Sequence, residues 1–124
     1  MRSSGIISQR RFAIAAAALF AIALLTLIAQ ARPSTSVNIV NNSTRAIRNV
    51  YLSHVDADDW SDNQLGDATI AAGQSLTLPS VACDQQQVKI IAEDQDGCFI
   101  TTVVDCGSSA TWTITNDSAR DCGN

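Results

Sequence analysis

The sequence is poor in the residues that most small metal and catalytic domains depend on. It has a single histidine, His54, and no C-x-x-C pair, although structural zinc sites use closely spaced cysteine and histidine ligands. It also has no G-x-S-x-G motif of the kind that presents a hydrolase serine. Ser53 precedes His54, but a catalytic triad is defined by spatial roles rather than adjacency. We therefore expect His54 to be an exposed residue at a loop edge.

Basic and aromatic residues are scarce as well. From Arg32 onward, five Lys and Arg residues stand against all 12 carboxylates, a balance of −7. Such a charge repels phosphate backbones, and no basic stripe or row of stacking aromatics is present, so nucleic-acid binding is disfavoured. Only 5% of the residues are aromatic. A sugar platform for paired-carboxylate glycosidase chemistry is therefore not expected.

The first 31 residues have the pattern of a secretory signal. Three arginines and no acidic residue accompany an unbroken apolar run at residues 12–29. Ala29 and Ala31 close this run as an A-x-A site of the type that signal peptidase cleaves. The sequence therefore predicts residues 1–31 as a signal peptide and residues 32–124 as the mature domain.

The same apolar run leaves a second interpretation open. Its 18 residues are just long enough to reach across about 30 Å of hydrocarbon, so residues 12–29 could remain as an uncleaved membrane anchor. The Arg10-Arg11 pair also leaves a twin-arginine export route open. In each case the basic end stays in the cytoplasm. Residues 32–124 are then exported to the periplasm or the extracellular space, with membrane contact only through the anchor.

Four cysteines, all in the exported part, predict two disulfides in a small secreted domain. Residues 87–94 alternate in the manner of a strand, and residues 98–105 are rich in β-branched side chains. The sequence "DQDG" at 94–97 is a turn signal, most simply the tip of a hairpin. The two strands should therefore form a hairpin in which Glu93 lies roughly opposite Cys98.

The hairpin geometry selects one pairing of the cysteines. Cys106 falls opposite about residue 85, close to Cys83, whereas Cys98 lies on the order of 23 Å away at ~3.3 Å per residue. A disulfide requires Cα atoms within about 7 Å. A third strand at 110–116 can return the chain toward the turn and bring Cys122 near Cys98. We therefore expect Cys83–Cys106 and Cys98–Cys122, each closing a loop worth ~3 kcal/mol in the chain-entropy model.

The remaining pattern predicts an all-β domain, a two-layer antiparallel β-sandwich of six or seven short strands. Strands are expected at 36–42 and 46–53. Ile47 and Val50 are three residues apart, so in a regular strand their side chains would point to opposite faces. If both are buried in the same core, a bulge is expected near Arg48–Asn49. Short strands "ATI" and "QSLTL" should flank the Ala72-Gly73 turn, with Pro79 ending the second.

A set of spaced residues also carries a resemblance. It consists of Asn42, Thr44, "VYLS" at 50–53, Trp60, "LG" at 65–66, Ile70, Gly73, Ser75, Cys83-Asp84, Asp96-Gly97 and Asp105-Cys106. In their order and spacing, from Asn42 to Cys106, the chain resembles a family of small exported bacterial domains with no assigned function. The resemblance implies a β-sandwich with the Cys83–Cys106 bridge and no activity. Members of that family usually have proline where His54 stands, and the other two cysteines look like an addition.

Residues 54–67, "HVDADDWSDNQLGD", hereafter the acidic loop, contain five aspartates. The hard oxygens of Asp56, Asp58, Asp59 and Asp62 are of the kind that calcium prefers, and Ca²⁺ is the one cofactor that this composition suggests. The spacing does not match an EF-hand, because Trp60 takes position 3 counted from Asp58 and no glutamate follows at 12. The alternative is a solvated connection in which Trp60 and Leu65 pack against the sandwich edge.

These features together predict an exported, non-enzymatic β-sandwich domain. Its expected role is binding or structural in the cell envelope, through a sandwich edge or the acidic loop, toward an unidentified protein or envelope partner. The alternative is a small metal-dependent hydrolase or a calcium-binding module that uses the same loop. A cleft joining Asp58 and Asp62 with Asp94 or Asp96 would favour the hydrolase.

Overall fold

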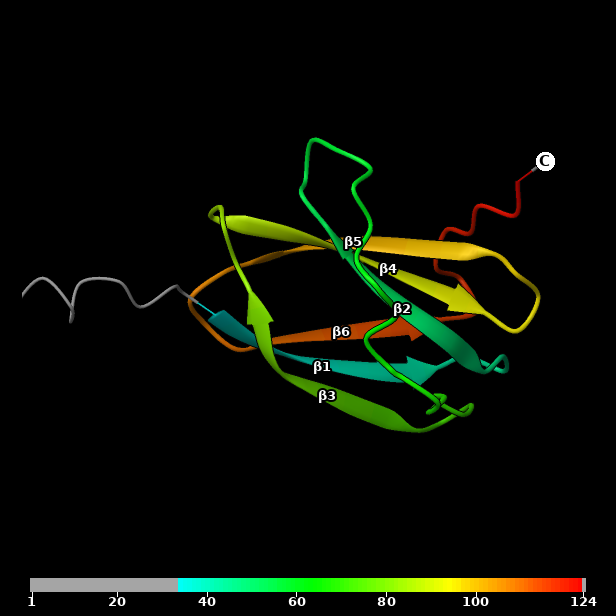
Figure 1. The fold of residues 1–124 in the computed structure, drawn as a ribbon. Coiled ribbons are helices and arrows are strands. Elements are labelled where there is room, and N and C mark those ends of the chain that lie inside the picture. Colours follow the sequence, from blue (N-terminus) through cyan, green and yellow to red (C-terminus); the bar gives the residue numbers. More distant parts are fainter. Residues whose placement is uncertain (1–33, 124) are drawn as a thin grey trace, which may run out of the picture. The chain divides into compact units, whose positions relative to one another are not determined.

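The computed structural model describes residues 34–123 and shows six strands in two three-stranded sheets (Figure 1). The predicted signal or anchor segment at residues 1–31 lies outside the described residues. Within 34–123, no helix has the length and apolar character needed to cross a membrane. The strands are β1 (Ser34–Asn42), β2 (Ile47–Ser53), β3 (Ser75–Ala82), β4 (Gln87–Asp94), β5 (Phe99–Asp105) and β6 (Ala110–Thr115).

The sheets have the orders β3-β1-β6 and β2-β4-β5, which confirms the predicted all-β sandwich. One pairing departs from the predicted antiparallel pattern, because β1 and β6 pair in parallel, from Val37 with Ala110 to Asn42 with Thr115. The tight connections reverse the chain direction, but the long segment 54–74 joins β2 to β3, which run the same way (Figure 1). β6 therefore arrives beside β1 in the direction of β1.

Side-chain alternation places the core between the two sheets. In β4, Val88, Ile90 and Ala92 belong to the buried cluster, whereas Ile91 is buried but lies outside it, on the opposite face of the sheet. The remaining members of the cluster come from the other strands and from three loop positions: Val37, Ile39, Ile47, Val50, Leu65, Ile70, Leu78, Val81, Cys83, Ile100 and Ile114.

The predicted bulge in β2 is confirmed. Ile47 and Val50 are both fully buried, and the register of β2 against β4 shifts between Ile47 and Asn49. One additional residue on β2 allows two side chains of unlike parity to face the same core.

The prediction that Pro79 ends its strand is wrong. β3 runs through Pro79 to Ala82, with a register shift against β1 between Leu78 and Val81. Because β3 is an edge strand, the missing N–H of proline removes no ladder hydrogen bond there. The segment "ATI" is also not a strand, since Ile70 makes only an isolated bridge to Ile47.

Both disulfides join the pairs expected from the hairpin geometry. Cys83 and Cys106 have Cα atoms 6.1 Å apart, and Cys98 and Cys122 have Cα atoms 4.1 Å apart. Two such bonds in a small domain indicate an oxidising, extracytoplasmic environment.

The hairpin register differs from the expected one by one residue. Glu93 pairs with Phe99 rather than Cys98, because Cys98 belongs to the turn and its carbonyl accepts a hydrogen bond from the Asp94 amide (2.9 Å). β6 lies in the other sheet, and the chain after it returns to β5, where Asp121 bridges Phe99.

Candidate functional site

The acidic loop forms hydrogen bonds along the outer edge of β2. The amide of Ser61 donates to the carbonyl of Leu52 (2.8 Å), and the Ser61 hydroxyl accepts from the Leu52 amide (2.9 Å). The Asn63 side chain similarly accepts from the amide of Val50 (2.9 Å). The loop thus satisfies backbone groups that an uncovered edge strand would leave unpaired.

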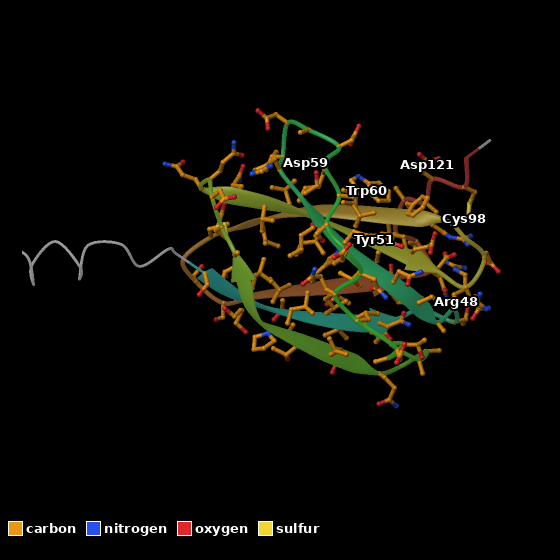
Figure 2. All side chains as sticks on the ribbon, in the orientation of Figure 1. Arg48, Tyr51, Asp59, Trp60, Cys98 and Asp121 are labelled. Carbon is orange, nitrogen blue, oxygen red and sulfur yellow. A yellow bond between two sulfur atoms is a disulfide. The ribbon has the colours of Figure 1, made fainter. Side chains whose placement is uncertain are left out.

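Trp60 packs on the outer face of the β2-β4-β5 sheet rather than against its edge (Figure 2). Its ring centroid lies 5.3 Å from that of Tyr51 and 5.1 Å from that of Phe99, in an edge-to-face arrangement. Ile91, the ladder partner of Tyr51, is buried on this same face. The aromatic rings account for that burial, while Trp60 itself remains 42% exposed. Leu65, in contrast, is buried in the core as expected.

The four aspartates expected to attract calcium do not form a ligand set. Asp58 pairs with Lys89 (3.1 Å), Asp59 accepts hydrogen bonds from Ser53 and His54, and Asp56 and Asp62 are exposed. Across the described part of the chain, no three His, Cys, Asp or Glu side chains form a group able to hold a metal ion. The carboxylates of the loop serve as local hydrogen-bond acceptors and salt-bridge partners. Because these partners differ, the carboxylates do not converge on one point.

The carboxylates proposed for a hydrolytic cleft are also separated. Asp58 contacts Lys89 near the start of β4, whereas Asp94 ends the same strand and is buried. Those two β4 positions are five residues apart, on the order of 17 Å at ~3.3 Å per residue.

His54 lies between two carboxylates from different parts of the chain. Its Nδ1 contacts the carboxylate of Asp59, and its Nε2 lies 3.5 Å from Oδ2 of Asp84. The hydrogen bond with Asp59, then its charge, then the contact with Asp84 raise the pKa of His54 above its ordinary value. The same hydrogen bond lowers the pKa of Asp59.

The histidine is at a loop edge, as expected, but its ion pairs were not anticipated. Asp84 is a partner that no motif in the sequence indicated. The β2–β4 register contains the signal that could have found it, because Ser53 pairs with Lys89. If that antiparallel register is continued beyond the strand ends, the residues after Ser53 lie near the β3–β4 turn, which contains Asp84.

Ser53 and His54 do not form a catalytic pair. The Ser53 side chain is buried, and its hydroxyl lies 2.9 Å from both the Ala57 carbonyl and Oδ1 of Asp59. A serine nucleophile needs an imidazole nitrogen facing its hydroxyl. Here both ring nitrogens of His54 face carboxylates, which stabilises the protonated imidazole instead.

A pocket of about 230 Å³ opens beside His54. Its size is below the roughly 300–1,000 Å³ of pockets that enclose drug-sized ligands. It therefore fits a single side chain or a small organic ion. Apolar walls and a polar rim are contributed by Leu52, Ser53, His54, Asp59, Ser61, Ala82, Asp84, Gln87 and Val88.

A second charged cluster surrounds Asp94, whose side chain is fully buried. Its carboxylate accepts from the amides of Asp96 (2.9 Å) and Cys98 (3.1 Å) and from Arg120 (2.8 Å). The Arg45 Nε lies 3.5 Å away. Burial alone would raise the pKa of Asp94, but the hydrogen bonds from the Cys98 amide and Arg120 outweigh it and lower that pKa.

The "DQDG" turn is thus more than the hairpin tip expected from the sequence. The burial of the Asp94 carboxylate could have been predicted from the alternation of β4, in which Val88, Ile90 and Ala92 point inward. Continuing that period of two places Asp94, and not Glu93, on the inner side.

The chain shows similarity to a solved structure but to no family model or curated protein. No protein-family model matches it, and no curated protein matches it. A solved structure, the NMR structure of the protein from Eubacterium rectale, is similar over 72% of this chain and 85% of that chain, with a TM-score of 0.45 and 11% identity. Similarity at this level carries no inference about function.

The raised pKa of His54 predicts a pH-dependent stability. A folded pKa above the unfolded value of about 6.5 means that the contribution is fully present below that pH and is lost as pH rises through the folded pKa. We expect the midpoint of thermal unfolding to exceed that of His54→Gln by a small margin at pH 5.5, and this margin to vanish at pH 9. Asp59→Asn should remove the same margin. Parallel curves for all three proteins would contradict the assignment.

Proposed function

We propose that this chain is an exported, non-enzymatic binding domain of the cell envelope, and that the pocket beside His54 receives a cationic side chain or a small amine. The observation that supports this proposal is the composition of the pocket. Leu52 and Val88 provide apolar walls, while Asp59 and Asp84 contribute carboxylates. Lysine and arginine have matching chemistry, because their apolar stems can be buried while the charged head meets an anion.

The overall charge favours the same class of ligand. Residues 32–124 carry a balance of −7, which attracts cationic partners over a distance. A protonated His54 already neutralises one of the two carboxylates that it contacts. Loss of that proton removes the positive charge that lies between Asp59 and Asp84, which favours the approach of an external cation. Cation binding should therefore strengthen as pH rises through the pKa of His54.

The absence of a catalytic arrangement at Ser53 and His54 supports a binding role rather than a hydrolytic one. The carboxylates of Asp58 and Asp94 are likewise separated instead of sharing a cleft. Both the acidic loop and the β3–β4 turn contribute to the pocket. The loop thereby has a function beyond covering the β2 edge.

Export and family membership are part of the proposal. The A-x-A site at Ala29 and Ala31 and the two disulfides support passage to the periplasm or beyond, with residues 1–31 cleaved or retained as an anchor. The order and spacing of the residues from Asn42 to Cys106 support membership of the family of small exported bacterial domains. On this proposal the Cys98–Cys122 bond is an addition to the family pattern.

The test is an NMR titration of the oxidised, exported protein with N-acetyl-lysine amide and with the uncharged N-acetyl-norleucine amide. At pH 8.5 we expect the lysine probe to shift the amide signals of Leu52, His54 and Val88 with millimolar affinity. The norleucine probe should shift them at least several-fold less. At pH 5.5, where His54 is protonated, the response to lysine should weaken by a similar factor.

Two variants locate the site. Asp84→Asn should weaken lysine binding at pH 8.5. Asp56→Asn removes an equal charge from a part of the acidic loop outside the pocket, and lysine binding should be unchanged in this variant. Equal responses to the charged and uncharged probes, or equal losses in the two variants, would refute the proposed specificity.

A further inference from the structure

Strand β5 forms one edge of the β2-β4-β5 sheet, and its backbone is only partly paired. Hydrogen bonds alternate along an antiparallel ladder, so that every second residue of an edge strand points its N–H and C=O away from its neighbour. Cys98 and Cys106 bond toward β4 and the residues around it, whereas Phe99 bonds outward, its amide to the Asp121 carbonyl (2.7 Å) and its carbonyl to the Asp121 amide (2.9 Å). By this alternation, Thr101 and Val103 also face outward.

These outward groups receive no backbone partner from the described residues 34–123. The bridge with Asp121 covers Phe99 and no later residue of β5. Asp105, next in the same alternation, ends the strand. The free part of the edge is therefore Thr101–Asp105.

Two other edge strands of the sandwich, β2 and β3, have features that prevent pairing and that β5 lacks. The acidic loop covers β2 through the backbone bonds of Ser61 and Gln64, and β3 contains Pro79 beside a register shift. Charges, prolines and bulges are the usual means of preventing edge pairing. β5 has none of them between Phe99 and Val104, a segment rich in β-branched residues. Val103 is one of three exposed large hydrophobic side chains in the described chain, at 42% exposure.

We propose that β5 pairs antiparallel with β5 of a second copy of this chain, across a two-fold axis at Val103. The resulting sheet has six strands, three from each copy. In this register Val103 meets Val103 of the second copy, and Thr101 meets Asp105 of the second copy. An axis at Thr102 would instead set Asp105 against Phe99, whose outward groups are already bonded to Asp121.

A second copy suits this edge because the strand is self-complementary. A two-fold axis brings one surface patch against itself, and here that patch is uncharged from Phe99 to Val104. The two Asp105 side chains lie about four residues apart along the pair, or ~14 Å. That distance exceeds the Debye length of about 8 Å at physiological salt. Each Asp105 also faces a Thr101 hydroxyl that can donate to it.

The interface is small, because it consists of a few ladder hydrogen bonds and one apolar pair. It belongs with transient interfaces that bury less than about 1,200 Å² in total. Association should therefore depend on concentration. It does not involve the His54 pocket, so it can be tested independently of the proposed ligand.

The test is sedimentation velocity of the oxidised, exported protein from micromolar to millimolar concentration, with amide hydrogen exchange on the same samples. We expect the average mass to rise toward twice that of the monomer and the Thr101 and Val103 amides to exchange several-fold more slowly at high concentration. Val103→Lys, which places two charges at the axis, should remain monomeric with an unchanged thermal midpoint. Thr101→Asp, which sets a second carboxylate directly opposite Asp105 of the other copy, should weaken association as well.

The matched control is Val55→Lys, which makes the same change at another exposed valine outside β5. This variant should associate like the original protein. A monomer at all concentrations would overturn the proposal, as would association that survives Val103→Lys or that is lost in Val55→Lys. Exchange of Thr101 and Val103 that is independent of concentration would overturn it without reference to any variant.

Discussion

Replacing Asp94 with alanine is expected to lower the free energy of unfolding by about 3–5 kcal/mol, the range found when one partner of a buried ion pair is removed. The carboxylate is fully buried and bonds to Arg120 and to the amides of Asp96 and Cys98. Its loss leaves these donors without their acceptor in a region that solvent reaches poorly. Urea unfolding of the oxidised protein measures the change.

Asp96→Ala provides the matched control. Asp96 contacts the same Arg120 guanidinium (3.0 Å), but its side chain is exposed. Exposed ion pairs contribute up to about 1 kcal/mol, so this variant should lose no more than that. Similar losses in the two variants would show that burial of Asp94 is not what makes its contacts important.

Removing the Cys98–Cys122 disulfide by paired alanine substitutions is expected to cost about 3 kcal/mol, according to the chain-entropy model for a loop of this length. The bond joins residues 24 positions apart and holds the C-terminal segment against β5. That segment carries Arg120, the partner of Asp94. The disulfide and the Asp94–Arg120 contact should therefore depend on each other.

A double-mutant cycle measures this dependence. Asp94→Ala combined with loss of Cys98–Cys122 should destabilise the protein by less than the sum of the separate effects, because each change weakens the same attachment. Asp94→Ala combined with loss of Cys83–Cys106, at the opposite end of the hairpin, should be additive within about 0.5 kcal/mol. Additivity in both cycles would contradict the coupling.

Features governed by local alternation were predictable from the sequence. The β4–β5 hairpin, the disulfide pairs and the β2 bulge all follow from short-range patterns and the fixed rise of a strand. In contrast, the parallel pairing of β1 with β6 depends on the long segment 54–74, whose path no local pattern specifies. The continuation of β3 through Pro79 depends on β3 being an edge, which is decided by the other strands.

The candidate site was harder to predict, because it too depends on contacts between segments that are distant in the sequence. The acidic loop attracted attention through its composition, yet its aspartates are separated by their own local partners. The residues that matter at the pocket and at the buried cluster, Asp84 and Asp94, acquire their roles from contacts with His54 and Arg120. Neither contact lies within a sequence window that a motif could cover.

The parallel pairing of β1 with β6 also has a consequence for the order of folding. β1 is the central strand of its sheet, and its partner β6 is the last of the six strands in chain order. A chain that crosses a membrane N-terminus first cannot complete this sheet until residues 110–115 have emerged. Contacts of such high sequence separation form slowly, and one disulfide requires Cys122, which emerges later still. The topology thus delays completion of the β3-β1-β6 sheet until almost the whole chain is available to fold.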